Sequence, residues 1–149
     1  MNIKSMQQAA TELYDWAKRQ YPEHRIIIMG HSYGTGMAAY LASARECDAL
    51  VLAGAYRDLS DLYNKMTPVF WGPLKVFISN NIETSKYAET VTCPVYVIGS
   101  ESDTTLSASL QRKVAKCFSN AELKIFENVR HENYFVTDEV IEYIKTNTG

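Results

Sequence analysis

Cysteine is scarce in this sequence, and the spacing of its cysteines forms no site of a known kind. Only three occur, Cys47, Cys93 and Cys117, and they lie far apart in the chain. An odd number of distant cysteines argues against a disulfide framework, and the lack of a Cys-x-x-Cys pair argues against a zinc site. We therefore expect reduced, buried thiols and no metal ion.

Long apolar runs are also missing. No stretch approaches the ~20 apolar residues that span a bilayer, and the first ten residues lack the pattern of a signal peptide. These absences predict no membrane span and favour a cytoplasmic location. Positive charge is not concentrated either, since 15 Lys and Arg residues are scattered among 17 Asp and Glu residues. No nucleic-acid partner is expected from such a distribution.

What is present suits a single globular domain over residues 1–149. The hydrophobic fraction is 46% and the charged fraction 21%, with no internal repeat and no linker. Helical spacing or helix-prone composition predicts helices at 5–20, 37–45, 106–118 and 136–145. Short apolar runs predict strands at 25–29, 49–53, 94–99 and 123–126.

Strands that alternate with helices indicate parallel βαβ units. We therefore predict an α/β fold with a parallel sheet of about four strands and helices on both faces. The unbroken run Ile26-Ile27-Ile28 is typical of a strand that is buried on both faces.

The motif with the clearest chemistry is Gly30-His31-Ser32-Tyr33-Gly34, which matches G-x-S-x-G. An isoleucine-rich strand precedes it and an alanine-rich helix follows, which is the setting of a nucleophile elbow. We expect Gly30 and Gly34 to let the strand and helix approach closely, and His31 to line the elbow. The Tyr33 N–H, at the helix start, is the candidate oxyanion donor.

A nucleophilic serine needs a base and an orienting carboxylate. We predict His131 as the base because it follows the last strand, whereas His24 lies in a polar turn that precedes the first strand. For the acid we predict Asp103, which follows the third strand. Glu101 and Asp138 are alternatives, but Glu101 sits too near the strand end and Asp138 is placed to cap the last helix.

The same glycines allow a second interpretation. Gly30, Gly34 and Gly36 spell G-x-x-x-G-x-G, which resembles the nucleotide turn of short-chain dehydrogenases. That family places the turn near its start and needs Tyr-x-x-x-Lys downstream, whereas here the spacing occurs only upstream, at Tyr14 and Lys18. A nucleotide-binding domain therefore stays only a minor alternative.

Together these residues resemble the α/β-hydrolase superfamily. The chain order Ser32, Asp103, His131 is that family's order, and Cys93 to Asp103, read as CPVYVIGSESD, is similar to its strand and acid turn. The short connection between Gly54 and Cys93 resembles a lid-poor branch of serine aminopeptidase-like hydrolases and depalmitoylase-like thioesterases. The resemblance implies the C-terminal half of the fold, without the family's N-terminal strands and the second oxyanion donor that they carry.

This resemblance implies a serine hydrolase that cleaves an ester, thioester or amide through an acyl-enzyme on Ser32, without a cofactor. A truncated or inactive relative that acts as a binding module is the alternative. Phe70 and Trp71 lie in an aromatic stretch that either lines an acyl pocket or packs over the sheet. Without a neighbouring strand, residues 25–29 would form an apolar edge, which predicts self-association.

Overall fold

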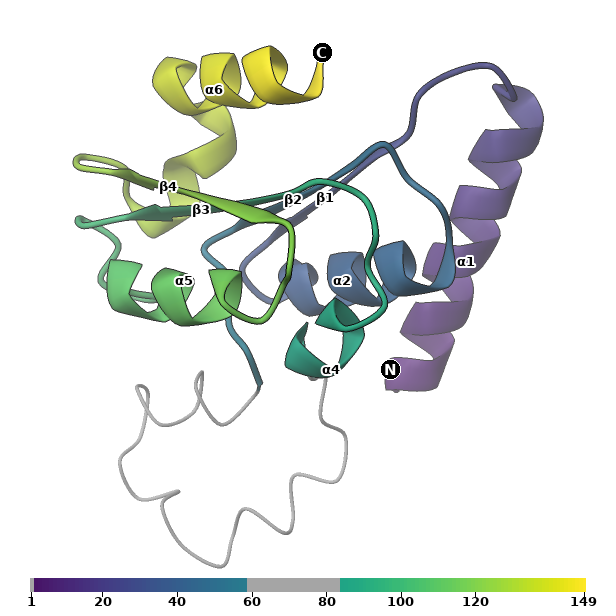
Figure 1. Ribbon diagram of the computed structural model, residues 1–149, viewed down its shortest axis with the longest axis horizontal. Coiled ribbons are helices and arrows are strands. Elements are labelled where there is room, and N and C mark those ends of the chain that lie inside the picture. The colour runs from purple at the N-terminus through teal and green to yellow at the C-terminus, as the bar shows by residue number, and fades with distance from the viewer. Residues whose placement is uncertain (1, 59–83) are drawn as a thin grey trace, which may run out of the picture.

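The computed structural model describes residues 2–58 and 84–149 (Figure 1). Phe70, Trp71 and the aromatic stretch around them lie outside the described residues. The helices are α1 (Ile3–Gln20), α2 (Gly34–Ala44), α4 (Thr84–Ala88), α5 (Ala108–Ala115), the 3₁₀ helix η3 (His131–Val136) and α6 (Asp138–Thr148). The strands are β1 (Ile27–His31), β2 (Ala49–Ala53), β3 (Val95–Ser100) and β4 (Ala121–Phe126).

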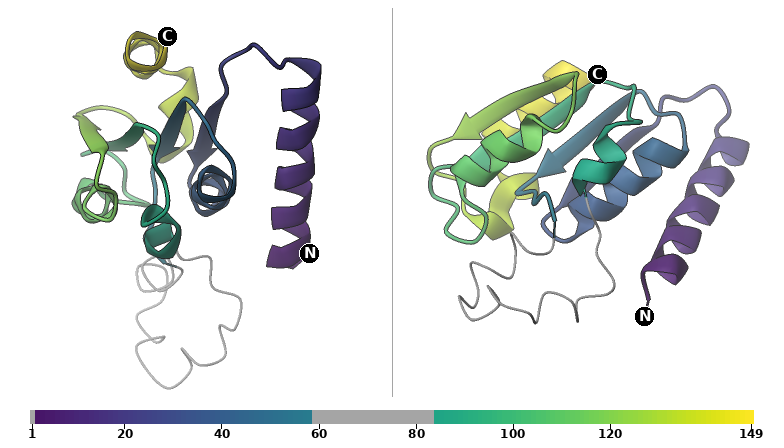
Figure 2. Two further views of the ribbon diagram at one scale, coloured as in Figure 1. Left: turned by 45° about the vertical axis from the view of Figure 1, so that its right-hand side comes forward. Right: turned by 60° about the horizontal axis from the view of Figure 1, so that its bottom comes forward.

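The four strands form one sheet in the order β1-β2-β3-β4, and each neighbouring pair is parallel. Helices α2, α4 and α5 lie on one face of the sheet, and η3 and α6 lie on the other (Figures 1 and 2). This arrangement confirms the predicted α/β fold. Because all strands run the same way, the segments that follow them meet at one edge of the sheet.

Two groups of buried side chains hold the layers together. Beneath α2 and α5, residues such as Ala39, Leu50 and Val114 are fully buried against one face of the sheet. On the opposite face, Tyr134 and Val140 pack on Val51, Ile98 and their neighbours. Strand β2 lies between both groups and is buried along its whole length, so it serves as the central strand of the core.

Strand β1 differs from the prediction in position and burial. It begins at Ile27 rather than residue 25 and continues through Gly30 and His31, which pair with β2. Ile28 is buried, but Ile27 and Met29 are 36% and 45% exposed. The prediction of burial on both faces was therefore wrong within the described residues, because α2 covers only one side of this edge strand. Self-association through residues 25–29 stays a prediction.

Several helix ends also differ from the predicted ones. Helix α2 begins at Gly34 rather than residue 37, and α5 is shorter at both ends than predicted. In α1 the apolar stripe is only partly used, since Leu13 and Trp16 are 65% and 49% exposed. Among the described residues, no helix is both long enough and apolar enough to cross a membrane.

A buried glutamine joins α5 to the end of β2. The Gln111 side chain is fully buried. Its Oε1 accepts a hydrogen bond from the Ala55 N–H at 2.7 Å, and its Nε2 donates to the Ala55 carbonyl at 2.8 Å. The same Nε2 donates to the Leu106 carbonyl at 3.2 Å. One side chain thus satisfies the backbone groups of two segments that leave the sheet at the same edge.

We predict that Gln111→Leu lowers the free energy of unfolding by roughly 2–4 kcal/mol, because it leaves buried Ala55 groups without partners. Urea denaturation measures this change. Gln20→Leu, at the exposed end of α1, is the matched control and should have little effect. Equal stability of both variants would contradict the structural role of Gln111.

Candidate active site

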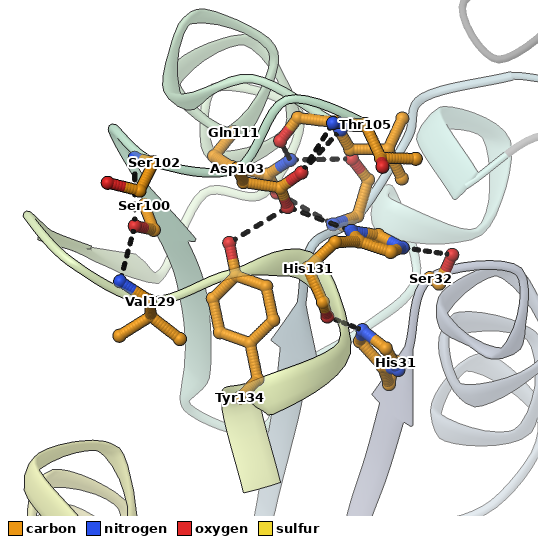
Figure 3. Close-up of polar contacts among 12 residues, drawn as sticks. His31, Ser32, Ser100, Ser102, Asp103, Thr105, Gln111, Val129, His131 and Tyr134 are labelled. Carbon is orange, nitrogen blue, oxygen red and sulfur yellow. Dashed lines mark hydrogen bonds and ion pairs between the residues drawn. The ribbon is translucent and has the colours of Figure 1, made fainter. Parts of the chain in front are cut away.

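Three side chains predicted from the sequence meet at the carboxyl edge of the sheet (Figure 3). Ser32 follows β1, Asp103 follows β3, and His131 begins η3 after β4. The Ser32 Oγ lies 2.8 Å from the His131 Nε2, and the His131 Nδ1 lies 2.8 Å from the Asp103 Oδ2. We call these three residues the polar triad.

The hydrogen-bond partners set the direction of proton donation in the polar triad. A carboxylate can only accept, so the His131 Nδ1–H donates to Asp103. The Nε2 then carries the lone pair and accepts the Ser32 hydroxyl proton. This is the arrangement in which an imidazole can remove a proton from a serine.

The Asp103 carboxylate is held by four hydrogen bonds. Its Oδ1 accepts from the Thr105 and Leu106 backbone N–H groups, each at 2.8 Å. Its Oδ2 accepts from His131 and from the Tyr134 hydroxyl at 3.0 Å. Asp103 is only 2% exposed, and a buried charge needs such partners. Its position therefore depends on the loop after β3 and on η3 together.

Ser32 occupies a sharp turn with a strained backbone. Its φ is 52°, and it is the one non-glycine residue with positive φ in the described part of the chain. The turn is fixed by the Ser32 N–H, which donates to the Ala53 carbonyl at 3.0 Å, and by the Thr35 hydroxyl, which donates to the Ser32 carbonyl at 2.6 Å. Such strain at a side chain aimed outward is typical of functional sites.

The two glycines of the elbow have different roles. A Cβ at residue 30 would lie 2.7 Å from the Ala38 Cβ and 2.8 Å from the Gly34 carbonyl oxygen, so only glycine fits between β1 and α2. A Cβ at Gly34 would meet no atom within 4 Å. The expectation that both glycines are needed for close approach is therefore correct for Gly30 and wrong for Gly34, which begins the helix on its open side.

His31 lines the elbow, as predicted, and supports His131 through its backbone. Its Nε2 donates to the His131 carbonyl at 2.7 Å, and the two imidazole rings lie 4.9 Å apart. Burial lowers the pKa of His31 below its usual value. The geometry fits a neutral imidazole with its proton on Nε2, because a carbonyl oxygen can only accept and a neutral ring has one N–H to donate.

Tyr33 lies at the N-cap of α2. Its backbone N–H precedes the hydrogen-bond ladder of the helix, where N–H groups have no partner within the helix. The Tyr33 carbonyl, in the next peptide along the chain, accepts from the buried Tyr56 hydroxyl at 3.2 Å, which anchors the start of α2. A negative charge that develops beside Ser32 would also lie at the positive end of the α2 dipole.

Two supporting residues, Tyr134 and Ser100, were missed in the sequence. Burial and the nearby carboxylate raise the pKa of Tyr134, so its hydroxyl stays protonated and donates to Asp103. The Ser100 Oγ accepts from the Ser102 and Val129 N–H groups, both at 3.1 Å, and so joins the loops that carry Asp103 and His131. Neither residue belongs to a sequence motif, so the sequence alone does not indicate that they hold the loops of the polar triad in place.

The alternative residues lie elsewhere. His24 is exposed, and Glu101 pairs with Arg112 at the surface at 3.3 Å. Asp138 is the first residue of α6, whose N-cap is Thr137, so its predicted capping role was wrong. His131 begins a 3₁₀ helix rather than lying in a loop. Within residues 2–58 and 84–149, no group of three or more His, Cys, Asp or Glu side chains could hold a metal ion.

A polar pocket of about 300 Å³ adjoins the polar triad. Its lining residues are Ser102, Thr104, Thr105, Arg130, His131 and Glu132. Hydroxyl, guanidinium and carboxylate groups make this pocket suitable for a polar group with hydrogen-bonding atoms. His131 thus belongs both to the polar triad and to the lining of this pocket.

Fold and site geometry agree with the comparison to known families. A family model described as alpha/beta hydrolase fold matches residues 4–85, more than half of the chain, so this chain belongs to the α/β-hydrolase family. Membership of this family favours the elbow interpretation of Gly30 to Gly34 over the dehydrogenase-like one. The lid-poor branch predicted from the short connection stays a prediction.

Curated relatives include lysophosphatidylserine lipases named ABHD12. The protein of Danio rerio is 27% identical over 128 residues, which cover 74% of this chain and 33% of the relative. The protein of Rattus norvegicus is 25% identical over 128 residues, which cover 74% and 32%. This chain therefore spans about a third of the length of these relatives.

Solved structures share the fold at low sequence identity. An α/β-fold family hydrolase from Bacillus anthracis has a TM-score of 0.70 and 14% identity, and the match covers 97% of this chain and 74% of that one. An esterase from Pyrococcus furiosus has a TM-score of 0.66 and 21% identity, with 91% and 59% covered. These similarities show a common fold.

We predict that Gly30→Ala destabilises the protein by about 1–3 kcal/mol, because the added methyl group overlaps Ala38 and the α2 backbone. Gly34→Ala is the matched control at the other elbow glycine, and it should be neutral or slightly stabilising. Chemical denaturation of both variants measures the difference. Similar losses at the two positions would contradict the asymmetric packing of the elbow.

We also predict a pH dependence that comes from His31. Its pKa is lower in the folded than in the unfolded protein, so the unfolded chain binds the proton more readily. The stability that His31 contributes is therefore present above about pH 6.5 and is lost as the pH falls below it.

His31→Gln keeps a side-chain N–H donor but does not titrate, so its free energy of unfolding should decline less between about pH 7.5 and 5. Denaturant titrations across this range measure both slopes. His24→Gln, which removes an exposed histidine, is the control. Parallel curves for the parent and His31→Gln would show that His31 does not cause the acid loss.

Proposed function

We propose that this chain carries the catalytic site of a serine hydrolase that cleaves acyl esters through an acyl-enzyme on Ser32. The observation that carries the proposal is the continuous path of 2.8 Å contacts from the Ser32 Oγ through His131 to Asp103. The strained turn at Ser32 supports it, because the turn aims a hydroxyl away from the sheet and toward the imidazole.

The geometry suits a two-step acyl transfer. The Ser32 oxygen attacks the carbonyl carbon of the ester while His131 takes its proton. The oxyanion forms at the start of α2, within reach of the Tyr33 N–H. His131 then donates the proton to the leaving alcohol, and Asp103 stabilises the imidazolium. Water, activated by the same imidazole, attacks the acyl carbonyl and releases the acid and Ser32.

The pocket beside His131 supports a substrate class. The leaving alcohol must lie near the His131 Nε2 to receive its proton, and His131 is also one of the residues that line the polar pocket. We therefore propose an ester whose alcohol part carries hydroxyl or charged groups. The curated relatives are named lysophosphatidylserine lipases, which makes lysophosphatidylserine the first physiological ester to test, ahead of thioesters and amides.

Ser32→Ala should lose labelling by a fluorophosphonate probe and lower the rate of ester hydrolysis at least roughly 10³-fold, because the nucleophile is absent. In-gel fluorescence and release of p-nitrophenol from a short acyl ester measure the two effects. Ser109→Ala, an exposed serine on α5, is the matched control and should behave as the parent.

Two outcomes would redirect the proposal. Equal labelling of the parent and Ser32→Ala would remove Ser32 as the reactive group. Labelling at Ser32 without turnover of p-nitrophenyl esters or lysophosphatidylserine would instead favour a binding module that keeps the polar triad.

A further inference from the structure

Two cysteine sulfurs lie in contact at the edge of the sheet opposite the polar triad. Cys47 precedes β2 and Cys93 precedes β3, and they are 46 positions apart in the chain. Their Sγ atoms are 3.0 Å apart. None of the three cysteines is in a disulfide. The spacing of the cysteines in the sequence did not predict this contact.

The sheet register places the two residues side by side. Leu50 pairs with Val95, so Cys47, three residues before Leu50, and Cys93, two residues before Val95, lie just before the starts of neighbouring parallel strands. Such strands run about 4.8 Å apart, and disulfides join Cα atoms separated by roughly 4.4–6.8 Å. A bond therefore needs the sulfurs to approach by only about 1 Å, with no rearrangement of the sheet.

A surface pocket adjoins Cys47, one member of this pair. It has a volume of about 230 Å³ and is lined by Tyr14, Lys18, Ile26, Glu46, Cys47 and Asp48. Cys47 is half-buried and lines this pocket, while Cys93 is buried, with 8% of its surface exposed. Hydrogen peroxide, which is only slightly larger than water, is small enough to enter this pocket and approach Cys47.

The contact also favours one ionised sulfur. The hydrogen bond from the Cys47 S–H lowers the pKa of the Cys93 thiol, and the same bond together with burial raises the pKa of Cys47. A thiolate that stands beside a thiol is the arrangement from which a disulfide forms, because the thiolate reacts with the oxidant and the thiol resolves the product.

We propose that Cys47 and Cys93 are a redox modification site that a hydroperoxide converts to a reversible disulfide. The thiolate attacks one oxygen of hydrogen peroxide, the O–O bond breaks, and the departing hydroxide takes up a proton to become water. The sulfenic acid left behind is attacked by the second sulfur, which gives up its proton, and the S–O bond breaks with loss of water. Two thiols are oxidised by two electrons, and one peroxide is reduced to two waters.

The disulfide is expected to change the stability of the fold and not the chemistry of the polar triad. The disulfide would close a loop of 46 positions that includes β2 and α4, which restricts the unfolded chain and stabilises the folded one. The polar triad lies at the opposite edge of the same sheet, and thiol counts and melting temperatures are measured without substrate, so the readouts of oxidation do not depend on hydrolysis or on the proposed function.

The test treats the whole chain with a small excess of hydrogen peroxide and then counts thiols by alkylation and intact mass under denaturing conditions. Alkylatable thiols should fall from three to one in the monomer, a peptide joining Cys47 to Cys93 should be recovered, and dithiothreitol should restore all three. The melting temperature should rise by roughly 5–10 °C on oxidation.

Cys47→Ser and Cys93→Ser should form no intramolecular crosslink and show no upward shift, while Cys117→Ser is the matched control and should keep both effects. Three thiols after oxidation, a crosslink through Cys117, or conversion to sulfinic acid without a crosslink would overturn the proposal. Peptide mapping of the oxidised parent decides the question even where a serine variant does not fold.

Discussion

The arrangement of the site depends on one buried carboxylate. Asp103 lies almost entirely out of water, so its charge is tolerable only while backbone N–H groups, a tyrosine and an imidazole donate to it. That requirement fixes the loop after β3, the start of η3 and the ring of His131 relative to one another. The ring in turn fixes which nitrogen faces Ser32. A buried charge at the edge of the sheet thus orders groups that belong to three separate connections.

The parallel sheet separates two kinds of chemistry. Its carboxyl edge holds oxygen and nitrogen groups, joined by Ser100 and Gln111 so that the connections after β2, β3 and β4 keep their places. Its amino edge brings Cys47 and Cys93 into contact. Each edge gathers residues that are distant in the chain because every strand runs in the same direction. The strands separate the two edges, so the groups at one edge do not contact those at the other.

The sequence was informative where chemistry follows a motif or an element order. The positions of Ser32, Asp103 and His131 after successive strands were predictable, because the family's order and the pattern of the strands give them. Tyr134 was not, since its contact with the acid arises only when η3 folds under the loop. The Cys47–Cys93 contact depends on sheet register, which no spacing rule supplies. Gly34 was misinterpreted because a motif does not say which of its glycines is packed. The exposed side of β1, at Met29, was missed because an apolar run looks the same with one covered face or two.

Gly54 shows how a residue without a side chain can be part of this site. It has a φ of 54°, and a Cβ there would lie 3.2 Å from the His131 Cε1 and 3.2 Å from the Tyr134 Cε2. The imidazole therefore rests directly on bare backbone, in space that the smallest side chain would occupy. The His131 ring keeps this position only while residue 54 has no side chain. A search for functional groups alone would overlook Gly54, although its lack of a side chain determines where the His131 ring can lie.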